Sequence, residues 1–167
     1  PTTLALLAAV SFVLATAAPR AQAQSRHAVL DLWTAGKPVF GVFVPQGWKM
    51  DLVSIDGAQA KWAKAVEVAQ LAERLGFDSL WVYDHFHNVP RPATEAVFEC
   101  WTTMAAISQL TSTIRLGQMV GCNSYRNPGL LAKITANIDV MSGGRLDWGI
   151  GAGWYENEYR AYGFDFP

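Results

Sequence analysis

From Val39 onward, short apolar runs alternate with longer amphipathic segments. The apolar runs are rich in β-branched and aromatic residues and predict four strands, at residues 39–44, 79–83, 115–120 and 145–150. Each interval between them leaves room for one crossover helix. This alternation is typical of repeated βα units built around a parallel sheet.

Two of the intervals carry apolar residues at helical spacing. The first stripe consists of Trp62, Ala65, Val66, Ala69 and Ala72, and the later one of Leu131, Ile134, Ile138 and Met141. Asn127 is expected to cap the later helix, with Pro128 in its first turn. Gly76 and the pair Gly143–Gly144 are expected to end the two helices. Each stripe is therefore predicted to cover a face of the sheet.

The N-terminal region differs from the rest of the chain. Residues 4–18 form an uncharged apolar run, shorter than the ~20 residues that a membrane-spanning helix needs. Ala21-Gln22-Ala23 follows as an A-x-A cleavage signal. We therefore expect a signal peptide at 1–23, a linker or foreign extension at 24–38 and a folded domain at 39–167; the alternative for 1–23 is a terminal helix. A genuine leader implies export, and a mis-joined N-terminus implies a cytoplasmic protein.

Composition narrows the class of protein. Hydrophobic residues make up 51% and charged residues 16% of the chain, enough apolar surface for a folded core. Thirteen basic and 14 acidic side chains give a net charge of −1, which argues against a nucleic-acid partner. The two cysteines, Cys100 and Cys122, form no CxxC pair, so neither a zinc ribbon nor a disulfide scaffold is indicated.

Unusual residues follow each predicted strand, and in parallel α/β folds ligands bind at the carboxyl ends of the strands. These residues are Pro45 and Gln46, then Asp84 to His87, then Gly121 to Asn123, and finally Gly151 to Trp154. Because these ends meet at one edge of a parallel sheet, the segments are expected to form one site.

His85 is the candidate general acid or base. The adjacent Asp84 carboxylate can orient an imidazole that titrates near neutral pH. The alternative is a solvated loop histidine, and His87 is a weaker candidate for the same role. His85-x-His87 also suits zinc, but the sequence offers no third ligand at a recognisable spacing, so no metal site is predicted.

Gly151-Ala152-Gly153 leads from the fourth predicted strand into an acidic, helix-like segment. Glycines there let backbone N–H groups approach a phosphate or a flat ring. Close packing of the strand against the helix is the alternative explanation. Trp154 and Tyr155 add aromatic surface beside the turn.

Several motifs together resemble the N-terminal part of the luciferase-like monooxygenase superfamily. They are FGVFVPQGW at 40–48, GFDSLWVYDHF at 76–86, RLGQMVGCNSYRNPGLLAK at 115–133 and SGGRLDWGIGAGWYENEYRAYGFDFP at 142–167. The version here is most similar to the branch that uses coenzyme F-420 (also written F420), a 5-deazaflavin. The resemblance implies an α/β fold, the N-terminal half of a (β/α)8 TIM barrel with about four βα units, preceded by the leader-like segment.

The resemblance also implies a site. His85 would be the proton donor or acceptor, steadied by Asp84, and a non-proline cis peptide would fall within residues 119–122. The substrate would be a small molecule contacting Trp154, where some sugar-phosphate dehydrogenases of the family carry a glutamate. A homodimer is a candidate assembly. Cofactor contacts are expected from Asp84, Met119, Val120, Gly121, Asn123, Gly151, Ala152 and Gly153.

These observations favour an oxidoreductase that transfers a hydride between a deazaflavin or flavin and a small organic substrate. One alternative is an FMN-dependent monooxygenase that uses molecular oxygen. A second is an incomplete, non-catalytic barrel fragment, since half a barrel exposes sheet edges. A third rests on residues 25–41, which resemble the opening of the HpcH/HpaI aldolases and would imply a divalent metal.

Overall fold

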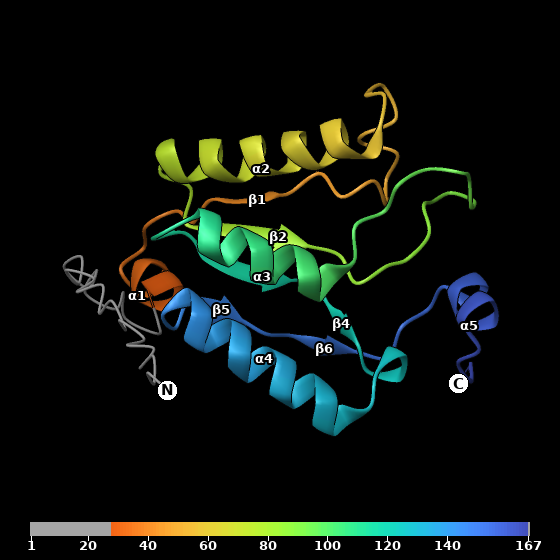
Figure 1. Cartoon of the computed structure of the whole chain (residues 1–167). Coiled ribbons are helices and arrows are strands. Elements are labelled where there is room, and N and C mark those ends of the chain that lie inside the picture. The colour runs from red at the N-terminus through yellow and green to blue at the C-terminus, as the bar shows by residue number, and fades with distance from the viewer. Residues whose placement is uncertain (1–27, 167) are drawn as a thin grey trace, which may run out of the picture.

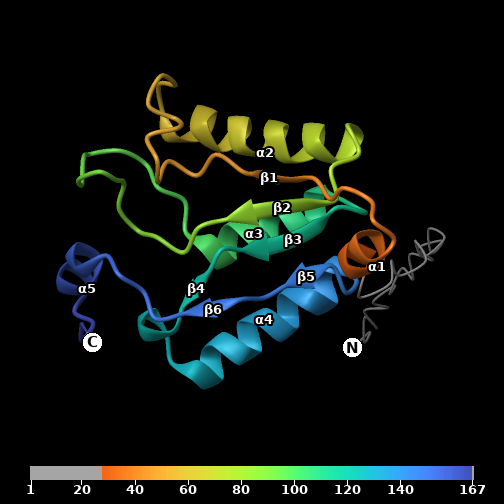
Figure 2. The same ribbon diagram turned by 180° about the vertical axis from the view of Figure 1, so that it is seen from behind.

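A computed structural model describes residues 28–166 of the chain, so the predicted leader lies outside the described residues. The main sheet has four parallel strands in the order β1-β2-β3-β5 (Figures 1 and 2). Their bounds are Gly41–Phe43, Ser79–Val82, Arg115–Gln118 and Leu146–Asp147. The expectation of repeated βα units around a parallel sheet is thus confirmed.

The third and fourth predicted strands are each interrupted, so the single strands at 115–120 and 145–150 were wrong in extent. After the interruptions, β4 (Gly121–Cys122) and β6 (Ile150–Gly151) form a separate two-stranded parallel sheet. The Met119–Val120 peptide between β3 and β4 is cis, within the stretch that the resemblance indicated. Gly149 fixes the second break, because its carbonyl accepts from Gln118 Nε2 at 2.5 Å and from the Gly121 N–H at 3.1 Å.

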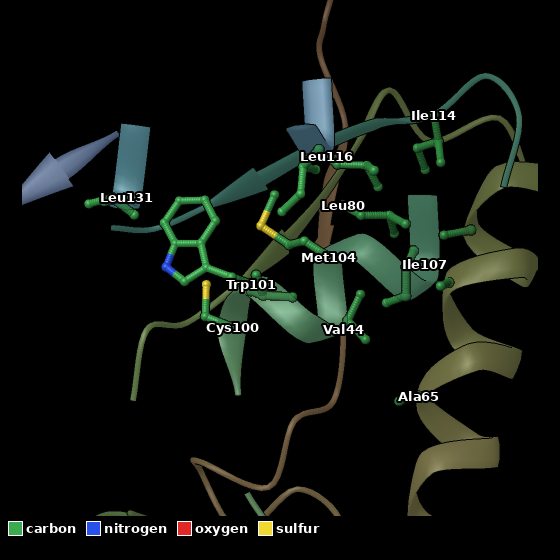
Figure 3. Packing of buried hydrophobic residues seen from close by; sticks show 14 residues of the cluster. Val44, Ala65, Leu80, Cys100, Trp101, Met104, Ile107, Ile114, Leu116 and Leu131 are labelled. Atoms are coloured by element: carbon green, nitrogen blue, oxygen red, sulfur yellow. The ribbon is translucent and has the colours of Figure 1, made fainter. Parts of the chain in front are cut away.

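Three long helices lie on one side of the main sheet, with α3 against the strands and α2 and α4 on either side of it (Figures 1 and 2). Their bounds are Ala58–Arg74 for α2, Cys100–Leu110 for α3 and Pro128–Ser142 for α4. The core between helices and sheet is apolar and well buried (Figure 3). It includes Val44, Leu80 and Leu116 from the strand segments and Ala65, Ala69, Met104, Ile107, Leu131 and Ile138 from the helices.

The helix signals were mostly correct. The Asn127 side chain accepts from the Gly129 and Leu130 N–H groups at 2.9 and 3.2 Å, and Pro128 opens α4. Gly143 ends α4 in the left-handed conformation, with φ of 73°. The predicted stripe fails at Met141, whose side chain is 47% exposed. Met141 lies in the last turn of α4, where the helix reaches the edge of the core.

Three short helices complete the described chain: α1 (Ala28–Thr34), η1 (Asn123–Tyr125) and α5 (Glu156–Tyr162). Helix α1 falls within the predicted extension at 24–38, and its Leu30 and Trp33 are largely exposed. Helix α5 lies beyond the carboxyl ends of the strands (Figure 1). Among residues 28–166 no helix is both long and apolar enough to cross a membrane.

Arg145 joins the carboxyl ends of two helices. Its buried guanidinium donates to the carbonyls of Ser108 and Thr111 near the end of α3, at 2.7 and 3.0 Å, and to that of Ser142 in α4, at 2.7 Å. The Ile114 carbonyl accepts a further bond of 2.8 Å. A cation placed there also opposes the partial negative charge of the helix ends. Arg145 therefore fixes how α3 and α4 meet.

Arg145→Met is expected to lower the free energy of unfolding by about 3 kcal/mol, because it leaves several buried carbonyls without donors. Urea denaturation measures the loss. Arg160→Met is the matched control, since the Arg160 side chain is 78% exposed and pairs with Glu156 on the surface. That change should cost less than about 0.5 kcal/mol. Equal losses for the two variants would contradict the role given to Arg145.

Candidate active site

The carboxyl ends of the strands enclose a cavity of about 210 Å³. Most of the predicted site residues line it, namely Asp84, His85, Met119, Val120, Gly151, Ala152, Gly153 and Trp154. Four more lining residues were not on the predicted list: Trp48, Tyr83, Cys122 and Tyr125. Gly121 and Asn123 were expected here but do not line the cavity; Gly121 is buried in β4 and Asn123 is exposed at the start of η1.

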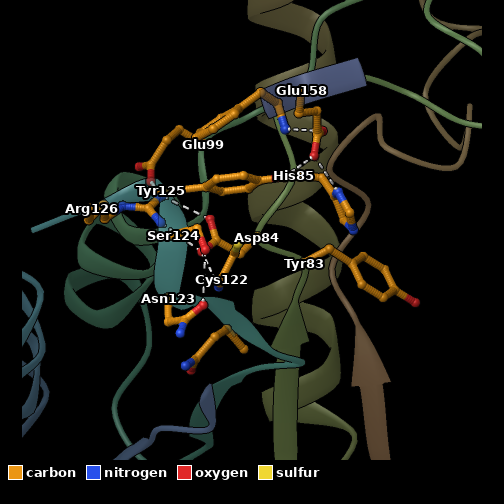
Figure 4. A network of polar contacts seen from close by, with 12 residues as sticks. Tyr83, Asp84, His85, Glu99, Cys122, Asn123, Ser124, Tyr125, Arg126 and Glu158 are labelled. Carbon is orange, nitrogen blue, oxygen red and sulfur yellow. Dashed lines mark hydrogen bonds and ion pairs between the residues drawn. The ribbon is translucent and has the colours of Figure 1, made fainter. Parts of the chain in front are cut away.

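His85 lies two residues beyond Tyr83, where the chain leaves β2, and its side chain is 12% exposed. Its Nδ1 is 2.8 Å from Oε2 of Glu158 (Figure 4). The Trp48 indole stacks on the imidazole, with ring centroids 4.3 Å apart and planes 3° from parallel. Within residues 28–166 no hydrogen bond reaches the other ring nitrogen, Nε2. This nitrogen is therefore the one left to meet a ligand.

Glu158 is fully buried in α5 and accepts four hydrogen bonds. Oε1 accepts from the backbone N–H groups of Phe86 and His87 at 2.6 and 2.8 Å. Oε2 accepts from the Tyr125 hydroxyl at 2.6 Å and contacts His85 Nδ1. Burial alone would raise the pKa of Glu158, but the bonds from His85, Tyr125 and His87 outweigh it and lower the pKa below its ordinary 4.5.

The Asp84 carboxylate bonds to other partners than His85, so the prediction that it orients the imidazole by direct contact was wrong. Its carboxylate accepts from both terminal nitrogens of Arg126, at 2.7 and 2.8 Å, and from the Cys122 N–H at 2.8 Å (Figure 4). Arg126 also donates to Glu99, the N-cap of α3, at 2.6 Å. Burial raises the pKa of Asp84, while Arg126 acts to lower it. Asp84 thus joins the end of β2 to β4 and α3, with both oxygens occupied.

His87 does not border the cavity. Its Nδ1 lies 2.8 Å from the Asn157 amide nitrogen, and its ring contacts Tyr162 of α5. In the part of the chain that the structure describes, no group of three His, Cys, Asp or Glu side chains is placed to hold a metal ion. Cys100 and Cys122 are free thiols.

The glycines of the turn after β6 serve close packing. A Cβ on Gly151 would lie 2.5 Å from Cγ2 of Val120. A Cβ on Gly153 would collide with the Tyr159 hydroxyl and lie 2.6 Å from Sγ of Cys122, and the φ of Gly153 is +82°. Packing against the following helix, the alternative explanation, therefore holds at Gly153, which faces Tyr159 of α5, whereas Gly151 packs against Val120 outside any helix. Gly151 and Gly153 also line the cavity, so this turn presents part of its surface to a ligand as well.

Glu158 is the main functional residue that sequence reasoning missed. It lies 73 positions from His85, and no local motif links the two. One signal was available: Tyr155, Tyr159 and Tyr162 recur at helical spacing, and Glu158 falls on the same face. A carboxylate within an apolar helical stripe is expected to be buried and to need partners.

The family model for luciferase-like monooxygenases matches residues 39–167. The chain belongs to this family. Solved structures similar to this luciferase-like chain are TIM-barrel enzymes, and its parallel α/β sheet covers only part of them. The fold and the family expected from the sequence are therefore confirmed, and F420-dependent enzymes are among the relatives of the chain.

Curated relatives of this luciferase-like chain include two actinobacterial enzymes. An F420-dependent glucose-6-phosphate dehydrogenase of Amycolatopsis mediterranei is 34% identical over 104 residues, which cover 61% of this chain and 31% of the relative. An F420-dependent hydroxymycolic acid dehydrogenase of Mycobacterium tuberculosis is 32% identical over 110 residues, 65% of this chain and 30% of the relative. The chain thus spans about a third of the length of these relatives.

Two solved structures resemble this chain in fold. An F420-dependent secondary alcohol dehydrogenase in complex with an F420-acetone adduct is 28% identical, with a TM-score of 0.60, over 77% of this chain and 36% of that one. The oxygenating constituent of 3,6-diketocamphane monooxygenase from Pseudomonas putida, in complex with FMN, is 20% identical, also with a TM-score of 0.60, over 75% and 32%. At that identity the second likeness shows the fold alone.

The lowered pKa of Glu158 predicts a loss of stability in acid. The ionised carboxylate stabilises the fold fully above pH 4.5, and this contribution is lost as the pH falls through the lower pKa of the folded state. Glu158→Gln should therefore unfold about 2 kcal/mol more easily than the wild type at pH 7. The difference should shrink below pH 4.5, as denaturation at several pH values would show.

Glu156→Gln is the control for this prediction. Glu156 lies in the same helix and pairs with Arg160 on the surface. Its variant should stay within about 0.5 kcal/mol of the wild type at every pH. A gap between Glu158→Gln and the wild type that persists unchanged to pH 3 would contradict the assignment.

Proposed function

We propose that the protein containing this chain is an oxidoreductase that transfers a hydride between a deazaflavin, coenzyme F-420, and a small organic substrate. One observation carries the proposal. His85 borders a cavity at the strand ends, with one ring nitrogen bonded to a buried carboxylate and the other without a partner among the described residues. Such an imidazole can give or take the proton that accompanies hydride transfer.

The cavity has the chemistry to hold a flat heterocyclic ring. Met119 and Val120 give it an apolar wall, and the 151–153 turn gives it a backbone wall. Nε1 of Trp48 is buried without a hydrogen-bond partner in the described chain. Buried indole N–H groups usually donate to an acceptor, and a ring carbonyl of a deazaflavin or flavin would supply one. When bound, the coenzyme would supply the carbon or nitrogen centre that accepts or donates the hydride.

The protein's own residues would bind the substrate and handle its proton. Apart from His85 and Asp84, whose carboxylate is paired with Arg126, the side chains lining the cavity are apolar or aromatic or carry a neutral polar group. This lining suits a substrate with a largely apolar body and one reacting hydroxyl or carbonyl group. As a hydride leaves the carbinol carbon, Nε2 of His85 takes the hydroxyl proton, and the reverse reaction returns it. Trp154, at the edge of the His85 ring, is the residue we assign to substrate contact.

The first test is a fluorescence titration of the full-length protein with coenzyme F-420 and, separately, with FMN. We expect saturable binding of F-420, weakened about 5-fold by Trp48→Phe, which keeps an aromatic ring but removes the unpaired N–H. Trp33→Phe is the control, because Trp33 is 73% exposed in α1. Binding of neither coenzyme would overturn the proposal. Binding of FMN with substrate-dependent oxygen uptake would replace it with a monooxygenase.

The second test addresses His85. His85→Gln should lower turnover of F-420 with a panel of small alcohols and ketones by roughly 10²–10⁴-fold, because the proton loses its acceptor. Binding of the coenzyme should persist. His87→Gln is the neighbouring control, since His87 does not border the cavity. Unchanged turnover in His85→Gln would remove this residue from the mechanism.

A further inference from the structure

The Glu158 carboxylate accepts from four donors, two at each of its oxygens. Oε1 receives two backbone N–H groups, while Oε2 receives the Tyr125 hydroxyl and His85 Nδ1. An ionised carboxylate has no proton to give. A bond of 2.8 Å between Oε2 and Nδ1 therefore requires the proton to lie on Nδ1.

We propose that Glu158 is the positioning residue of His85: it holds the proton on Nδ1, so that the neutral imidazole presents an unprotonated Nε2 to the cavity. The catalytic purpose of this positioning rests on the proposed function. The tautomer of His85 itself is a property of the protein without ligand. A neutral histidine with its proton on Nε2 would offer the cavity a donor and could not accept a substrate proton.

The aromatic neighbours of His85 hold the plane of its ring, and the bond to Glu158 fixes which edge of the ring faces Oε2. Trp48 covers one face of the ring, and Trp154 and Tyr155 approach at steep angles, with centroids 5.9 and 6.2 Å away. A half-turn of the imidazole would place a C–H group against Oε2 of Glu158 in place of Nδ1–H. The buried oxygen would then lose one of its donors, which carries an energetic cost.

The protonation of Glu158 and its neighbour Tyr125 agrees with this arrangement. The titratable groups that act on Glu158 are His85 from the loop after β2 and Tyr125 from η1, together with Tyr155 and Tyr159 of its own segment. Burial and the bond to Glu158 raise the pKa of Tyr125, so its hydroxyl stays protonated and donates. Glu158, whose pKa is lowered, is then the anion of the group and accepts from its neighbours.

Glu158→Gln separates positioning from a purely structural role. The carboxamide oxygen can still accept from the Phe86 and His87 N–H groups, so the loop keeps its anchor. The carboxamide nitrogen takes the place of Oε2 and can only donate. His85 Nδ1 must then become the acceptor, and its proton must move to Nε2. The substitution is thus expected to invert the tautomer.

The experiment is ¹⁵N NMR of the full-length protein with labelled histidine, without coenzyme, at a pH where the imidazole is neutral. The His85 signals are identified by their loss in His85→Gln. We expect protonated Nδ1 and unprotonated Nε2 in the wild type, and the reverse in Glu158→Gln. Tyr125→Phe is the matched control: it removes the other donor to Oε2 and should leave the wild-type tautomer in place.

Two outcomes overturn the inference. One is a wild-type protein with the proton on Nε2, which needs no variant and so holds even if Glu158→Gln fails to fold. The other is a folded Glu158→Gln protein with the wild-type tautomer. In turnover assays Glu158→Gln should lose at least 10-fold while binding F-420 as the wild type does. If no coenzyme binds but the tautomer inverts, the proposed function fails and the positioning role stands.

Discussion

The pairing of Asp84 with Arg126 sets the direction in which the chain leaves strand β2. Asp84 turns toward Arg126 and the Cys122 N–H, while the side chain of the next residue, His85, lies against Glu158 (Figure 4). Two buried carboxylates therefore have different tasks at neighbouring positions. Asp84 holds the end of β2 against β4 through Arg126 and the Cys122 N–H. Glu158 bonds to the imidazole of His85.

Much of the architecture was predictable because it depends on local chemistry. The Asn127–Pro128 start of α4 and the Gly143 stop each act through neighbouring residues, and each was correct. His85 was found because it lies just beyond the end of a strand, β2. The breaks within the third and fourth strands were missed because they depend on Gln118 and Gly149, which bond across strands 31 positions apart.

The site itself was only half predictable. Asp84 was the obvious partner for His85 by adjacency, yet its carboxylate bonds to Arg126 and the two neighbouring side chains have different partners. The true partner, Glu158, arrives from α5, which packs on the loop after β2 through contacts such as Phe86 with Tyr162 and Phe164. The glycines at 151 and 153 show a similar ambiguity. Their spacing suggested a ligand turn, and in the structure they also make room for Val120 and Tyr159.

The sequence separation of His85 and Glu158 has a consequence for the assembly of the site. Seventy-three positions divide the two residues, and two of the four strands of the main sheet, β3 and β5, lie between them in the sequence. Domains begin to fold while synthesis proceeds from the N-terminus. On the ribosome, β1, β2 and β3 can therefore pair while the imidazole still has no carboxylate beside it. The chemistry of the site is completed only when α5 emerges and closes over the strand ends.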